Sequence, residues 1–113
     1  GYLADSAFSS VHTGAYNHGI NTQKTKAVNR KDLSTAFHVY GIEWTDYSIS
    51  FYIDDLVYHV FKNEKLGTGA WPFDHEFHLL LNIAVGGNWG GKFGVNDKIF
   101  PQRMEVDYVR VYQ

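Results

Sequence analysis

Alternation of apolar and polar residues along several short segments is the feature that most constrains the fold of this chain. Residues 37–45 and 48–54 each repeat with a period of two, as expected of strands that bury one face. Asp54 and Asp55 then separate the second segment from the apolar-rich residues 56–61, which predicts a tight hairpin turn. These three segments therefore predict an antiparallel meander.

The remaining segments extend this prediction to an all-β chain. A helical pattern is confined to the short stretch Phe61–Leu66. Many short strands with hardly any helix indicate an antiparallel β-sandwich. At 113 residues, positions 1–113 are expected to form a single domain, or part of a larger two-sheet domain whose open edges need a partner. Further strands are expected at Ala7–Thr13, Glu76–Val85 and Met104–Gln113, with a weaker one near Val28.

Charge and composition exclude several classes of function. Charged residues make up 19% of the chain and the formal net charge is -2, so neither a nucleic-acid footprint nor a basic membrane patch is expected. The chain has no cysteine, which excludes thiolate chemistry and disulfides. No apolar run is long enough to span a membrane, and the sequence shows no signal peptide. An uncharged binding partner fits this small net charge best.

Aromatic residues make up 17% of the chain, and one of them has an unusual place. Most of these rings are explained by a β-rich core. Trp89, however, follows Asn88 in the stretch GGNWGG, where two glycines on either side leave little for an indole to pack against. A ligand-stacking role for this Trp is the alternative to a structural one.

Retaining glycoside hydrolysis needs two carboxylates about 5–5.5 Å apart. Glu105 and Asp107 occupy alternate positions of an expected strand and would face the same side. A strand with one solvated face has the same appearance, so this pair is not assigned a catalytic role. His75 and His78 would face opposite sides of a strand and do not predict a zinc site.

Five segments in this order resemble the C-terminal half of the family 16 glycoside hydrolases, most closely the bacterial laminarinases, which are endo-β-1,3-glucanases. The resemblance implies a jelly roll of two curved antiparallel sheets with a glucan-binding cleft along the concave one. It also implies hydrolysis with retention through a covalent glycosyl-enzyme intermediate. The five segments are VHTGAYNH, FHVYGIEWT, SFYIDD, WPFDHEFHLLLNIAVGGNWGG and FPQRMEVDYVRVYQ.

The catalytic motif of that family, E-x-D-x-x-E or E-x-D-x-E, does not occur in this sequence. Glu105 and Asp107 lack a third acid and match the family's terminal strand instead. The chain is therefore expected to contain no catalytic residue, with the nucleophile and the acid/base lying upstream of Gly1.

The resemblance does imply other site residues. His12 matches a histidine beside the catalytic carboxylates, although a structural role is an equal alternative for it. Asn88 and Trp89 match a loop at the rim of the cleft, where an amide could bind sugar hydroxyls and an indole could stack on a glucose ring. Asp107 matches an aspartate that often ligates a structural calcium ion. No cofactor is expected for the chemistry itself.

Three functional hypotheses remain open at the level of sequence. The chain could be part of a β-1,3-glucan hydrolase that is inactive alone, or a glucan-binding module without catalysis. It could also be a fragment that pairs with a complementary N-terminal half or with another copy of itself. The family resemblance implies that the protein is secreted or periplasmic.

Overall fold

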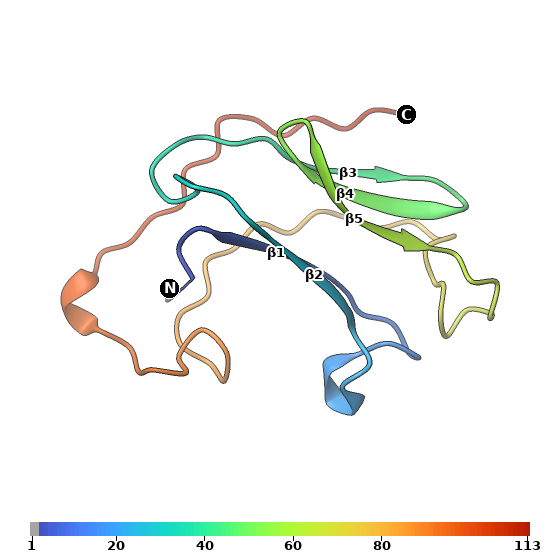
Figure 1. The fold of residues 1–113 in the computed structure, drawn as a ribbon, viewed down its shortest axis with the longest axis horizontal. Helices are drawn as coiled ribbons and strands as arrows, with labels where there is room; N and C mark the ends of the chain where they lie inside the picture. The colour runs from blue at the N-terminus through green and yellow to red at the C-terminus, as the bar shows by residue number, and fades with distance from the viewer. Residues whose placement is uncertain (1–2) are drawn as a thin grey trace. The chain divides into compact units, whose positions relative to one another are not determined.

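The computed structural model describes residues 3–113, and these divide into two compact units. Residues 3–77 make up one unit, and residues 78–113 belong to the other. All five strands lie in the first of them (Figure 1).

The first unit contains two antiparallel sheets. One is two-stranded and pairs β1 with β2, and the other is three-stranded in the order β3-β4-β5. The predicted meander is confirmed, and the weaker strand expected near Val28 is β2. The strands are β1 (Ser6–Val11), β2 (Lys24–Asn29), β3 (Tyr40–Trp44), β4 (Ser48–Ile53) and β5 (Leu56–Lys62), and two short 3-10 helices span His18–Ile20 and Asp97–Ile99.

The hairpin turn between β4 and β5 falls at Asp54 and Asp55, as the sequence predicts. Asp54 adopts a φ of 52°, a left-handed conformation that Asp tolerates better than most residues. Its backbone N–H donates to the carbonyl of Val39 at 2.7 Å, and one of its carboxylate oxygens accepts from the N–H of Val39 at 3.0 Å. The turn is thereby fixed to the chain that leads into β3.

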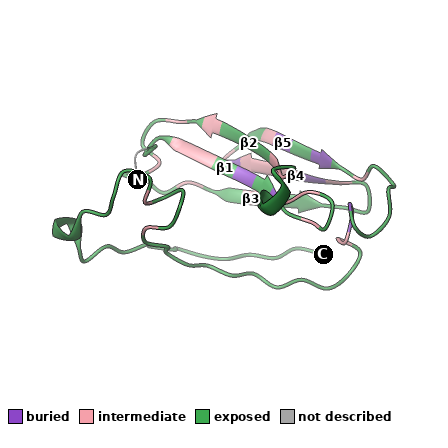
Figure 2. Cartoon of the chain, turned by 90° about the horizontal axis from the view of Figure 1, so that it is seen from below, coloured by how far each residue is buried: buried purple, intermediate pink, exposed green. Residues whose placement is uncertain are grey.

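The two sheets of residues 3–77 enclose a small core. Val11 of β1 packs with Ile49 of β4 and Phe61 of β5, and all three side chains are buried. Buried stretches of β1 and β5 are purple in Figure 2. Trp71 closes this cluster, with its ring stacked on that of Phe61 at a centroid distance of 5.5 Å. The expected all-β antiparallel sandwich is confirmed.

Two expected strands, at residues 76–85 and 104–113, are absent. Both segments are without assigned strand structure, and within residues 3–113 neither makes a ladder hydrogen bond. Alternation predicts which side chains share a face, but a strand also needs a neighbouring strand to bond its backbone. The helical hint at residues 61–66 is also wrong, because β5 continues to Lys62 and residues 63–66 are not helical.

The strand β3 leaves apolar side chains uncovered. Cross-strand pairing places Ile42 opposite Phe51 and Trp44 opposite Ile49, so these β3 residues face the same side as the core. Ile42 is nevertheless 51% exposed and Trp44 is 41% exposed. The two-stranded sheet thus covers the inner face of the larger sheet at β4 and β5 but not at β3.

Candidate functional site

The sheet of β1 and β2 has one face on the core and one face toward solvent. Ser9 and Val11 are buried, whereas Ser10 between them is exposed. Pairing sets Ser10 opposite Thr25, and the two hydroxyl oxygens are 2.8 Å apart. At this end of the sheet the outer face therefore carries two hydroxyl groups, whereas Phe8 lies farther along the same face.

His12 continues this outer face. It lies one residue beyond the end of β1 and two residues after Ser10, so alternation places both on the same side. Its side chain is exposed. An imidazole beside a pair of hydroxyl groups offers hydrogen-bond donors and acceptors to a polar, uncharged ligand.

The stretch GGNWGG forms a turn closed by its own backbone. Gly86 and Gly87 have φ values of 73° and 76°, in the left-handed region that favours glycine. The N–H of Gly91 donates to the carbonyl oxygen of Gly87 at 3.0 Å. Asn88 and Trp89 lie between these glycines and are both exposed, with 60% of Trp89 accessible to solvent.

Carboxylates near one another in the first unit belong to a charge network. Asp54 accepts from Nδ1 of His38 at 3.0 Å and pairs with Arg30 at 2.9 Å. Asp32 lies 3.2 Å from Nε2 of the same imidazole, within ion-pair distance but without hydrogen-bond alignment. The hydrogen bond from His38 lowers the pKa of Asp54, whereas a general acid of a glycosidase needs a raised pKa. This network therefore does not resemble a hydrolytic pair.

In the second unit, Glu105 and Asp107 are exposed. Glu105 forms an ion pair with Arg103 at 2.8 Å, and this pair balances its negative charge. Among residues 3–113, no three His, Asp or Glu side chains come together as a metal site. The calcium expected at Asp107 is thus not supported by the structure.

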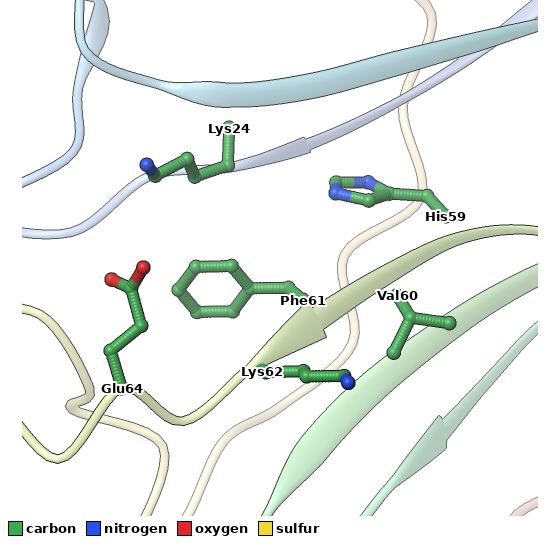
Figure 3. Close-up of a pocket in the computed structure, with 6 residues that line it drawn as sticks. All are labelled: Lys24, His59, Val60, Phe61, Lys62 and Glu64. Atoms are coloured by element: carbon green, nitrogen blue, oxygen red, sulfur yellow. The ribbon is translucent and has the colours of Figure 1, made fainter.

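A shallow hollow of about 280 Å³ lies between β2 and β5 (Figure 3). Two of its three charged side chains have partners, because Tyr16 donates a hydrogen bond to Glu64 and Lys24 lies over the Tyr16 ring at 4.2 Å. We therefore assign no ligand to this hollow. The lining residues are Lys24, His59, Val60, Phe61, Lys62 and Glu64.

This chain is similar to proteins of a known family. The family described as glycosyl hydrolases family 16 matches residues 3–110. The chain belongs to this family. A β-glucanase from Rhodothermus marinus is 47% identical over 118 residues, which cover 100% of this chain and 41% of that protein. A β-1,3-glucan-binding protein from Penaeus monodon is 30% identical over 95 residues, which cover 66% of this chain and 25% of that protein.

Solved structures agree with this membership. The laminarinase from Rhodothermus marinus superposes with a TM-score of 0.86 at 45% identity, covering 89% of this chain and 42% of that chain. The expected jelly-roll class is thereby confirmed. The chain spans about two fifths of the length of these R. marinus proteins. Within residues 3–113, no helix is long and apolar enough to cross a membrane.

His12, Asn88 and Trp89, which the sequence predicts as site residues, are all exposed. The hydroxyl pair of Ser10 and Thr25 is not evident from the sequence. Ser10 stands in the motif segment that carries His12, but its partner became visible only with the register of β1 and β2. A binding role for all five remains a prediction.

Proposed function

We propose that this chain provides the C-terminal part of the glucan-binding cleft in a retaining hydrolase of the endo-β-1,3-glucanase type. The observation that carries the proposal is membership of glycosyl hydrolase family 16 over residues 3–110. In this proposal His12 and the hydroxyls of Ser10 and Thr25 bind sugar in the first unit, and Asn88 and Trp89 bind sugar in the second. The natural setting is outside the cytoplasm, where polysaccharide substrates are found.

Each proposed contact has a simple chemical basis. The indole of Trp89 offers an apolar face on which a glucose ring can stack. The amide of Asn88, the imidazole of His12 and the hydroxyls of Ser10 and Thr25 match the neutral hydroxyl groups of a glucan. None of these five side chains carries a fixed charge, in keeping with an uncharged polysaccharide.

The chain of residues 1–113 by itself is proposed to be inactive in hydrolysis. The family's acidic catalytic motif does not occur in the sequence. The carboxylates of Asp32 and Asp54 are held by His38, and Glu105 is held by Arg103. The nucleophile and the acid/base are therefore assigned to a segment upstream of Gly1 or to a separate chain.

The release of reducing sugar from laminarin tests this assignment. The isolated chain is expected to show no turnover above the buffer control, whereas the R. marinus β-glucanase serves as the positive control. Turnover by the isolated chain would contradict the proposal and direct attention to an acid pair within residues 1–113.

A glucan-binding function without catalysis is the second candidate. It is favoured by the exposed Trp89 and by the relative from Penaeus monodon that is named as a β-1,3-glucan-binding protein. Titration with laminari-oligosaccharides, followed by tryptophan fluorescence, measures binding directly. A response that disappears in Trp89→Ala supports sugar binding, and a chain that shows no response contradicts both candidates.

Pairing with a complementary half or a second copy is a third possibility, supported by exposed apolar side chains. In the segments expected as strands, Leu80 is 79% exposed and Val111 is 72% exposed. Such residues are covered in a complete sandwich, and open strand edges seek partners. Light scattering is expected to show association, and a monodisperse monomer would argue against it.

A further inference from the structure

The backbone of the GGNWGG turn is packed against itself at Gly91. Among residues 78–113, Gly86 and Gly91 are the two that are half-buried, and the others are exposed. A Cβ atom at Gly91 would lie 2.7 Å from the carbonyl oxygen of Gly87 and 2.9 Å from Cα of Gly86. Real Cβ atoms do not approach other atoms so closely, and the atoms in the way belong to the main chain.

The same contact closes the turn. Gly91 donates its N–H to Gly87 at 3.0 Å, so the atom that a side chain would strike is also the acceptor of this hydrogen bond. A methyl group at position 91 must push the Gly87 carbonyl away and lengthen or break the bond. Asn88 and Trp89 lie within the stretch of chain that this hydrogen bond closes, so their orientation depends on it.

The geometry points to Gly91 as a positioning residue for sugar binding: its lack of a side chain lets the turn close and thereby aims Asn88 and Trp89 at a β-glucan. This inference rests on the proposed function, in which these two residues contact the sugar. A turn closed before binding spares the entropy of ordering a loop, which otherwise weakens a complex.

Neighbouring glycines do not share this role equally. A Cβ at Gly90 would meet the carbonyl oxygen of Gly86 at 2.9 Å, a single close approach, whereas Gly91 meets three main-chain atoms at 3.0 Å or less. Gly87 has open space around it and needs only a left-handed φ, which Asn can also adopt. Gly87→Asn is therefore expected to preserve the turn that Gly91→Ala disrupts.

The test uses the full chain labelled with 5-fluorotryptophan, because its three tryptophans give separate fluorine NMR signals. Trp89→Phe identifies the signal of Trp89. In the unsubstituted chain, titration with laminari-oligosaccharide is expected to shift this signal. In Gly91→Ala the midpoint of the shift is expected to move to at least tenfold higher sugar, with the signals of Trp44 and Trp71 unchanged.

Three comparisons make the outcome decisive. Gly87→Asn should keep the midpoint within about threefold, and Gly69→Ala, whose Cβ would meet nothing within 4 Å, should leave it unchanged. Equal midpoints for Gly91→Ala and the unsubstituted chain would overturn this inference alone. No shift of Trp89 in the unsubstituted chain would overturn the proposed function and the inference together. Altered Trp44 and Trp71 signals in Gly91→Ala would show a global rather than a positioning effect and would also overturn it.

Discussion

Ser9 and His59 join the two sheets of the sandwich by a buried hydrogen bond, with Oγ of Ser9 2.7 Å from Nδ1 of His59. The imidazole is stacked on Phe51 at a centroid distance of 5.1 Å. Burial, and to a smaller extent the charge of Lys26, lowers the pKa of His59 below its ordinary 6.5. The contact between the sheets is therefore built around a neutral histidine.

We expect acid to weaken this contact. Because the unfolded chain takes up a proton on His59 more readily than the folded chain, the stabilisation is complete above pH 6.5 and declines as the pH falls below it. The free energy of unfolding in urea should lose part of this acid dependence in His59→Gln. His75→Gln, which alters a side chain that is 72% exposed, should keep the slope of the unsubstituted chain.

Protonation of His38 is expected to affect the free energy of unfolding in the opposite direction. Its hydrogen bond to Asp54, assisted by the charge of Asp32, raises the pKa of the imidazole above 6.5. The resulting stabilisation is complete below pH 6.5 and is lost as the pH rises through the raised folded-state value. Asp54→Asn should flatten this loss when urea unfolding is measured above about pH 6. Asp55→Asn, an exposed neighbour in the same turn, should retain it.

Gly41→Ala should destabilise the three-stranded sheet. Gly41 is paired with Tyr52, and a Cβ at position 41 would lie 2.2 Å from Cε2 of the tyrosine ring. The ring must swing away, and we expect a loss of about 1 kcal/mol in the free energy of unfolding, of the size found for cross-strand pairs. In a Tyr52→Ala background the same change should cost clearly less. Equal costs in both backgrounds would show that the ring is not the obstacle.

Truncation of Trp71 and of Trp89 should have different effects on stability. Trp71 is 6% exposed and packs on Phe61, so Trp71→Ala should cost about 3–5 kcal/mol of stability. Trp89 is 60% exposed, so Trp89→Ala should leave the urea midpoint nearly unchanged while abolishing the response to laminari-oligosaccharide. A large loss of stability in Trp89→Ala would instead assign this ring a structural role.

The hydroxyl pair on the outer face can be tested without disturbing the core. Ser10→Ala combined with Thr25→Val removes both hydroxyls from exposed positions, so the free energy of unfolding should change by about 0.5 kcal/mol or less. Binding of laminari-oligosaccharide should weaken several-fold. Ser48→Ala, on the other sheet, should bind as the unsubstituted chain does, and an unchanged affinity in the double variant would remove the pair from the proposed site.

Alternation was sufficient to predict the meander β3-β4-β5, because each of these strands finds its partner next in the sequence. The turn at Asp54 was predictable from its residue types for the same local reason. Residues 76–85 and 104–113 have an equally strong pattern but no neighbouring strand among residues 3–113. Periodicity predicts which side chains share one face of a strand, but it does not predict which other strand will form hydrogen bonds with its edge.

The site was predictable only in part. His12, Asn88 and Trp89 were found because they stand in motifs that resemble the family. The pairing of Ser10 with Thr25 depends on register, and the closure of the turn at Gly91 depends on backbone dihedral angles. Neither quantity is encoded in residue type at a single position.

The backbone closure of the turn at Gly91 also has a consequence for how sugar preference can change in evolution. Because the hydrogen bond from Gly91 to Gly87 joins main-chain atoms only, it requires no particular side chain at residues 88 and 89. Substitutions at these two positions can then alter which sugar is preferred without a compensating change elsewhere. The turn is therefore expected to keep its closed backbone when residues 88 and 89 are exchanged, provided that its glycines are kept.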